Sequence, residues 1–154
     1  MKTKTLILVS LVTVLISCSK QGQYNQFVDF GEENRWQKTD IKTFEFDVTD
    51  ATPLYNLIFK FSHVYDYQFD SVPINFIIES PDAKKENIPI NLIIKDNNQK
   101  QLAECSGDIC DLNYKIKEKI KLIKGKYKIT ISHNFKGPYL PNVIGIGFKV
   151  ESVK

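Results

Sequence analysis

The chain has 154 residues, 42% of them hydrophobic, and a formal net charge of +3 at pH 7. A chain of this length fits one domain that can bury a self-sufficient core. The small net charge excludes functions that depend on a strongly basic or acidic surface, and removal of a leader that contains Lys2 and Lys4 lowers the charge to +1.

The first predicted element is a secretory leader that ends in a lipobox. Two lysines precede an apolar run at residues 6–16, which as a helix spans about 16 Å and is too short to cross a bilayer. Leu15-Ile16-Ser17-Cys18 then places a thiol directly after a small residue, as a bacterial lipoprotein precursor requires. We therefore predict a lipoprotein signal peptide at residues 1–17 and lipid attachment at Cys18. A plain signal peptide with a chance cysteine is the alternative.

Residues 18–26 are polar and unpatterned, which is typical of a tether. Two or more acyl chains, such as palmitate, on Cys18 would anchor this tether stably to a membrane. Ser19 is not the aspartate that retains lipoproteins in the inner membrane under the best-known sorting rule. We therefore expect an outer-membrane protein whose folded domain, residues 27–154, faces the periplasm or the outside.

From residue 43 onward, apolar residues recur at every second position, which is the period of a β-strand. One-sided alternation predicts strands with one wet face at residues 44–48, 127–131 and 144–150. Runs that are apolar at both parities predict central strands at residues 54–61, 74–78 and 90–94. Turn-forming residues separate these segments. The patterns together predict an all-β fold, a single antiparallel β-sandwich of the jelly-roll or immunoglobulin-like kind.

An aromatic segment follows the first central run. Tyr65, Tyr67 and Phe69 alternate with polar residues, and such rings can form a loop that stacks on a sugar or contacts a protein. The same rings can instead cover the open end of the sandwich. We prefer this second interpretation, because aromatic side chains more often fill space.

Residues 114–122 fit either a strand or a short helix. Ile116, Ile120 and Ile123 share one face of a helix, but apolar residues alternate with lysines for longer, so we predict a strand. The lysines at 115–121 would then form a stripe on one strand face. A solvated edge is the default interpretation of this stripe, and attraction to anionic lipid head groups is the alternative. Nucleic-acid binding is not expected, because no stacking aromatic residues interrupt the lysines.

The sequence contains no recognised catalytic or metal-binding motif. His63 and His133 each lie near the end of a predicted strand, without a G-x-S-x-G nucleophile motif or the ligand spacing of a zinc site. Glu104, Asp108 and Asp111 can offer oxygen ligands to Ca²⁺, but they lack the EF-hand order, and a solvated loop is the preferred interpretation. We therefore predict no enzyme, no cofactor, no metal and no small-molecule substrate.

Several landmarks occur in order along almost the whole processed chain. They are Trp36, Phe44-Glu45-Phe46, Tyr55-Asn56-Leu57, Asp66-Tyr67-Gln68-Phe69, Ser80-Pro81-Asp82, Gly107-Asp108-Ile109 with Asp111, Gly125-Lys126-Tyr127, and Leu140-Pro141-Asn142-Val143-Ile144-Gly145-Ile146. In this order and spacing they resemble the GldH-type gliding-motility lipoproteins. The resemblance implies a lipid-anchored envelope protein that is associated with the gliding apparatus and with secretion of surface adhesins, and that has no known catalytic activity.

This resemblance implies two kinds of partner, the membrane and envelope proteins of a motility or secretion apparatus. The alternative function is a glycan-binding or ligand-binding envelope lipoprotein, which would use the loop with Tyr65, Tyr67 and Phe69.

The sequence departs from the family pattern at Cys110, where the family more often has tyrosine. Cys105 precedes it with four residues between, and in an oxidising envelope the pair can close a small disulfide loop if the chain turns at Gly107. In an extended segment the two side chains would point apart. Two unpaired, partly buried thiols are the preferred interpretation, and the disulfide is the alternative.

Overall fold

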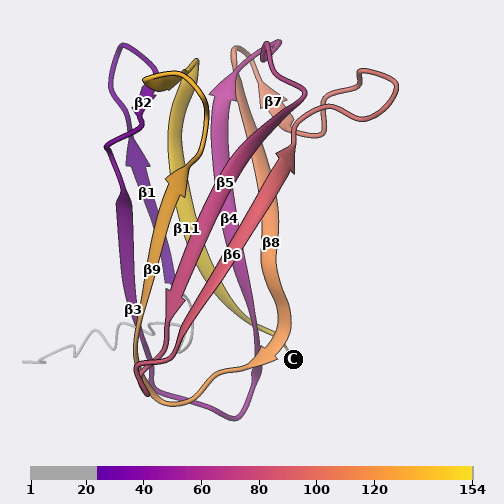
Figure 1. The fold of residues 1–154 in the computed structure, drawn as a ribbon. Helices are drawn as coiled ribbons and strands as arrows, with labels where there is room; N and C mark the ends of the chain where they lie inside the picture. Colours follow the sequence, from indigo (N-terminus) through magenta and orange to yellow (C-terminus); the bar gives the residue numbers. More distant parts are fainter. Residues whose placement is uncertain (1–23, 154) are drawn as a thin grey trace, which may run out of the picture.

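The computed structural model describes residues 24–153, which form one β-sandwich (Figure 1). The larger sheet has the strand order β1-β11-β4-β8-β7, the smaller sheet has the order β3-β9-β5-β6, and β10 pairs with β2 in a short ribbon. All these pairs are antiparallel. The strands are β1 (Tyr24–Asp29), β2 (Arg35–Gln37), β3 (Lys42–Val48), β4 (Leu54–Val64), β5 (Ser71–Glu79), β6 (Lys85–Ile93), β7 (Glu104–Ser106), β8 (Ile109–Lys121), β9 (Gly125–His133), β10 (Tyr139–Pro141) and β11 (Val143–Val153). The predicted all-β sandwich is confirmed.

The strand order distinguishes between the two kinds of sandwich that the sequence left open. Without the short strands β2, β7 and β10, four strands remain in each sheet, and most strands that follow one another in the chain lie in opposite sheets. Two such four-stranded antiparallel sheets are the arrangement of a jelly roll. In an immunoglobulin fold, by contrast, the first two strands pair within one sheet.

The sandwich has two ends, which we name after a residue at each. At the Tyr24 end, β1 begins and β11 finishes, since Tyr24 pairs with Val150. At the His63 end, β4 and β9 finish, and His63 pairs with Val143 at the start of β11. The Tyr24 end is the lower one in Figure 1, and the two chain termini of the described part lie there together.

Aromatic side chains fill much of the space between the sheets. Phe46 of β3 packs on Phe148 of β11 with 5.8 Å between ring centroids, and Phe59 of β4 packs on Phe76 of β5 with 5.1 Å. The predicted alternation at residues 44–48 and 127–131 corresponds to β3 and β9, whose alternate residues are buried. Two-sided apolar runs predict β4 and β5 correctly as interior strands.

Strand β6 corrects the prediction for residues 90–94. The prediction was a central strand, but β6 is the outer strand of the smaller sheet. Leu92 and Ile94 are buried, whereas Ile93 is 47% exposed on the other face. Pro89 fits this position because an edge strand does not need every N–H group for pairing.

Strand β1 shortens the predicted tether at residues 18–26. Tyr24, Asn25 and Gln26 lie in β1 and pair with the end of β11. The polar residues Asn25 and Gln26 are exposed, so no apolar alternation indicates the strand. The approach of β1 to β11 is close, because a Cβ atom at Gly145 would lie 2.4 Å from the carbonyl oxygen of Val28. The predicted signal peptide and Cys18 lie outside the described residues.

Residues 114–122 are strand, as predicted, but their lysines do not share one face. Two register shifts interrupt the pairing of β8 with β4. Lys119 has a φ of 51°, and its backbone N–H donates a hydrogen bond to Asn56 Oδ1 at 2.9 Å. At each shift β8 has one residue more than β4, and as a result Lys117 lies opposite the buried Leu57. The prediction of a single basic stripe is therefore wrong, because β-bulges change which side chains face outward.

Candidate functional site

The aromatic loop of the sequence closes the His63 end of the sandwich. Tyr67 is fully buried and packs on Phe61 and His63 at centroid distances of 5.8 and 4.8 Å. Phe69 is partly buried between Tyr67 and Phe135, at 5.7 and 5.0 Å. Only Tyr65 is well exposed, at 62%. Tyr67 therefore cannot contribute to a surface ring cluster, and the glycan-binding alternative loses this ring of its three.

Both histidines are buried at this end. Nδ1 of His63 donates to the carbonyl oxygen of Val64 at 2.8 Å, and its buried Nε2 has no partner among the described residues. Nε2 of His133 donates to the Trp36 carbonyl at 3.1 Å, and its Nδ1 accepts from the Phe135 N–H at 3.3 Å. Burial lowers the pKa of each histidine, because the charged form loses its water.

We expect the domain to lose stability as the pH falls below about 6.5, the histidine pKa in an unfolded chain. In that range the unfolded chain binds more protons than the folded one, whose histidine pKa values are lowered, so acid favours unfolding. Each histidine contributes a slope of at most about 1.4 kcal/mol per pH unit. Urea unfolding at several pH values measures the slope. The variant His133→Gln should flatten it, and an unchanged slope would contradict the assignment.

The hairpin of β7 and β8 joins the same end of the sandwich. Cys105 and Cys110 are opposite each other in its register, with Cα atoms 4.0 Å apart. Gly107 provides the turn, with a φ of 62°. The turn brings both side chains to one face, where the disulfide that the sequence allows can close.

We predict that Cys105 and Cys110 form a disulfide in the exported protein. The loop is short, so the chain-entropy estimate gives only about 2 kcal/mol, a local stabilisation of the hairpin. Intact-mass measurement after alkylation under denaturing conditions tests the bond. We expect no alkylated cysteine at these positions before reduction and two after it. Two alkylated cysteines in the unreduced sample would rule the disulfide out.

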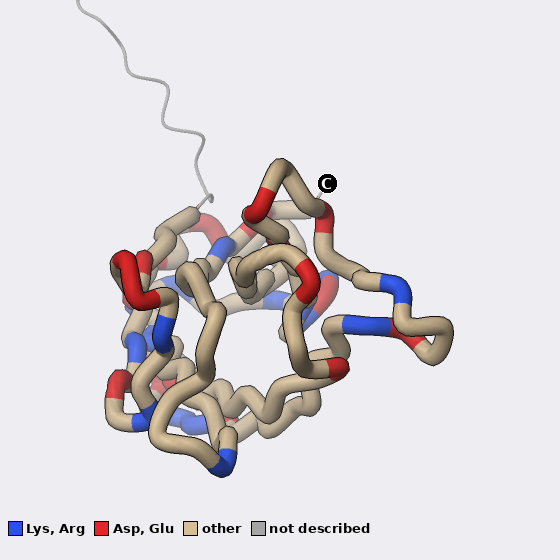
Figure 2. The backbone as a smooth tube through the Cα atoms, turned by 90° about the horizontal axis from the view of Figure 1, so that it is seen from above, with Lys and Arg blue, Asp and Glu red and all other residues tan. Residues whose placement is uncertain are grey.

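Exposed apolar side chains surround this hairpin. Tyr65, Leu102 and Ile109 are 62%, 47% and 49% exposed, and we call them the hairpin patch. The Tyr65 N–H donates to the carbonyl oxygen of Asp108 at 2.8 Å, which fixes Tyr65 beside the hairpin turn. The segment between β6 and β7, which carries Leu102, stands out from the sandwich when viewed along its long axis (Figure 2). Tyrosine is among the residue types enriched at protein contacts.

Asp111 of the acidic cluster forms an ion pair within the larger sheet. Asp111 pairs with Lys60 at 2.8 Å and accepts a hydrogen bond from Ser62. Burial by itself would raise the pKa of Asp111, but these two donors lower it overall. Residues 24–153 contain no group of three or more histidine, cysteine, aspartate or glutamate side chains that could hold a metal ion.

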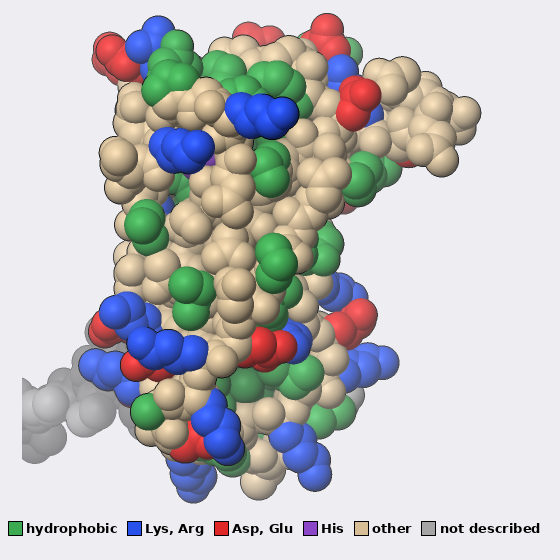
Figure 3. All heavy atoms as spheres, viewed as in Figure 1, with side chains coloured by type: hydrophobic (Ala, Val, Ile, Leu, Met, Phe, Trp, Pro, Cys, Tyr) green, Lys and Arg blue, Asp and Glu red, His purple; other side chains and the backbone are tan. Residues whose placement is uncertain are grey.

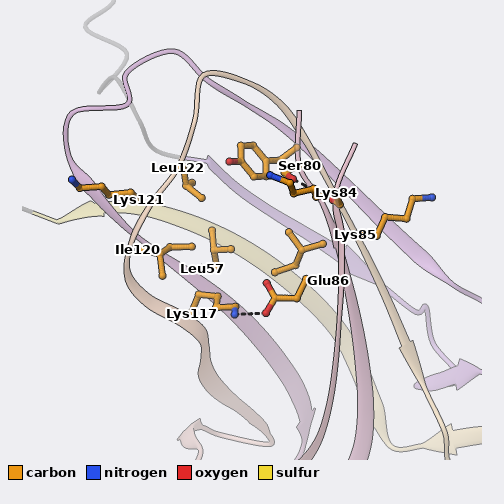
Figure 4. A pocket seen from close by; sticks show the side chains of 11 residues that line it. Leu57, Ser80, Lys84, Lys85, Glu86, Lys117, Ile120, Lys121 and Leu122 are labelled. Atoms are coloured by element: carbon orange, nitrogen blue, oxygen red, sulfur yellow. Dashed lines mark hydrogen bonds and ion pairs between the residues drawn. The ribbon is translucent and has the colours of Figure 1, made fainter. Parts of the chain in front are cut away.

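A cavity of about 370 Å³ opens between the edges of the two sheets near the Tyr24 end (Figure 4). Its floor is apolar, with Leu57, Leu122 and Tyr127, and lysines lie around its mouth. Lys117 of β8 pairs there with Glu86 of β6 and so connects the two sheet edges. No helix in the described part of the chain is long and apolar enough to cross a membrane.

Comparison with known proteins agrees with the family resemblance. Residues 22–150 match the model of the GldH lipoprotein family. The chain is 24% identical to the gliding motility lipoprotein GldH of Flavobacterium johnsoniae over 94% of both chains. It is 23% identical to a gliding motility lipoprotein GldH homolog of Christiangramia forsetii over 98% of both. The crystal structure of dimeric latent PorU from Porphyromonas gingivalis matches 85% of this chain and 13% of its own, with a TM-score of 0.37 and 8% identity.

Proposed function

Because the chain belongs to the GldH lipoprotein family, we propose that it is an accessory protein of the gliding apparatus that acts by binding other envelope proteins. The family match covers almost the whole described domain. The named function of its Flavobacterium johnsoniae relative, gliding motility, supports this role. A link to the secretion of surface adhesins is part of the same proposal.

The proposed anchor is a lipid on Cys18, after removal of a signal peptide at residues 1–17. The lipobox Leu15-Ile16-Ser17-Cys18 and the lipoprotein relatives support it. Acyl chains on this cysteine hold the protein to a membrane, and Ser19 favours the outer membrane. Residues 18–23 then form the tether between the lipid and β1.

The observation that carries the binding role is the position of the hairpin patch. Tyr65 and Ile109 lie at the His63 end, opposite the end where β1 begins. A protein that is anchored before Tyr24 therefore presents the hairpin patch to partners beyond the lipid surface. Its exposed Tyr65 suits a protein partner, since tyrosine is enriched among the few residues that contribute most of the binding energy at protein interfaces.

Affinity purification from solubilised membranes tests the proposal. The wild-type chain should retain envelope proteins, and the variant Tyr65→Ser with Ile109→Ser should lose them by about tenfold or more, since truncation of a hot-spot side chain costs about 2 kcal/mol or more and about 1.4 kcal/mol is a tenfold change. Ile41→Ser is a matched control, because Ile41 is 57% exposed just before β3. Equal recovery of partners by wild type and the double variant would contradict the proposed contact surface.

A further inference from the structure

The connection between β8 and β9 lies beside the start of the described chain. Tyr24 packs on Phe46 with 5.8 Å between ring centroids, and Phe46 stacks on Tyr127 at 5.2 Å. The hydroxyl of Tyr127 accepts a hydrogen bond from the backbone N–H of Ile123 at 3.1 Å. These contacts connect the first strand to the β8–β9 connection, at the lower end of Figure 1.

The chain on both sides of this connection is rich in lysine. Residues 115–128, which include the end of β8 and the start of β9, contain seven lysines and a single carboxylate, Glu118, which pairs with Lys115. Lys119, Lys121 and Lys124 are exposed, and within residues 24–153 none of the three has a carboxylate within 4.0 Å. In Figure 3 many blue Lys and Arg side chains lie over the lower end of the sandwich, with red Asp and Glu side chains among them.

An exposed apolar side chain lies among these cations. Ile123 is 49% exposed between Lys121 and Lys124, whereas the neighbouring Leu122 is buried. Single exposed apolar residues are common and need no explanation by themselves. An isoleucine flanked by unpaired lysines combines an apolar group that can enter the lipid interface with cations that can bind lipid phosphates.

We propose that Lys119, Lys121, Ile123 and Lys124 form a docking face for an anionic bilayer. Ile123 enters the head-group region, and the three lysines bind phosphates of the surrounding lipids. This inference rests on the anchor proposed above. From Cys18 to Tyr24 there are six residue steps, which reach about 22 Å at most. The docking face is thus held close to the lipid surface, where its attraction to anionic head groups is strongest.

The docking face would give the protein a fixed orientation. With the Tyr24 end on the bilayer, the His63 end and its hairpin patch point away from the lipid. A tether alone permits many orientations. The docking face therefore adds to the proposed function, because it would point the hairpin patch in one direction, away from the bilayer.

Fluorescence quenching tests this orientation. The lipidated, processed chain is placed in phosphatidylglycerol vesicles that contain a lipid with a quencher near its head group. The variant Ile123→Trp should lose roughly half or more of its added emission, because a side chain in the membrane interface lies at the depth of the head groups that carry the quencher. The native Trp36, which is buried toward the other end of the sandwich, also emits. Its emission is measured with the unsubstituted chain and subtracted.

A matched control uses the opposite end of the molecule. Ile41 is exposed to a similar degree as Ile123, and β3, which follows it, starts at the His63 end. The emission of Ile41→Trp should be almost unquenched. Replacing Lys119, Lys121 and Lys124 with glutamine in the Ile123→Trp chain should reduce the quenching at least about twofold, as should phosphatidylcholine vesicles.

The results distinguish a failure of the proposed docking face from a failure of the proposed anchor. Flotation of each chain with the vesicles reports the anchor. A chain that floats but shows no quenching at Ile123→Trp, or equal quenching at Ile41→Trp, overturns the docking face and leaves the anchor intact. A wild-type chain that does not float overturns both. Quenching that is unchanged by the lysine substitutions overturns the role of the three cations.

Discussion

Replacing Phe46 with alanine is expected to lower the free energy of unfolding by about 3 to 5 kcal/mol. Phe46 is 5% exposed and lies where the two sheets meet. Its ring stacks on Tyr127 of its own sheet and contacts Tyr24 and Phe148 of the other, all with centroids within 6 Å. Alanine therefore removes apolar contacts on both sides and leaves a cavity that rigid strands cannot fill by collapsing.

Urea denaturation followed by circular dichroism measures this loss. Thr43→Ala is a suitable control, because Thr43 lies in the same strand with an exposed side chain, and its substitution should change the stability by less than about 1 kcal/mol. A loss below about 1 kcal/mol for Phe46→Ala would mean that the ring does not support the contact between the sheets. The same variant should also loosen the β8–β9 connection, since Phe46 holds Tyr127.

The second large effect is expected at Cys18. Cys18→Ala should abolish lipid labelling and leave an unprocessed or soluble protein, because the thioether lipid is the proposed membrane anchor. Each buried methylene contributes about 0.8 kcal/mol to membrane binding, so loss of two or more acyl chains cannot be offset by a few surface lysines. Growth with a fatty-acid probe, followed by fractionation, measures both results.

The control for this experiment is Ser19→Ala, which keeps the thiol and should be labelled like the wild-type chain. Equal labelling of wild type and Cys18→Ala would show that the lipid is attached elsewhere or that none is attached. The Cys18→Ala protein should form the predicted Cys105–Cys110 disulfide only if it still reaches an oxidising compartment, which separates a failure of export from a failure of lipidation.

Several features of this protein could be predicted from local sequence because they depend on neighbouring residues. Alternation of apolar and polar residues determines β3 and β9, where each inner side chain faces the core and each outer one faces water. The lipobox at Cys18 is likewise a local pattern, and it predicts an anchor without any knowledge of the fold. The ordered landmarks predicted the family, which the match to residues 22–150 confirms.

Other features were decided only when distant segments paired. The apolar run at 90–94 looks central, but β6 is an edge strand because nothing pairs with its outer side among the described residues. Register shifts against β4 divide the lysines of β8 between two faces. The strand order of a jelly roll depends on which strands meet, and a local period carries no information about partners.

At the candidate sites, too, local sequence predicts some features and the tertiary structure decides others. The local pattern gives Tyr65, Tyr67 and Phe69 the same prediction, because all three are aromatic residues that alternate with polar ones. In the structure Tyr67 packs beside Phe61 and His63, and only Tyr65 stays well exposed. Burial of an aromatic ring depends on the space that other strands leave open, so only the tertiary structure decides which of the three rings is buried. The hairpin turn likewise brings Cys105 opposite Cys110. Contacts through Phe46 and Tyr127 bring Ile123 near Tyr24, although about a hundred residues separate the two in sequence.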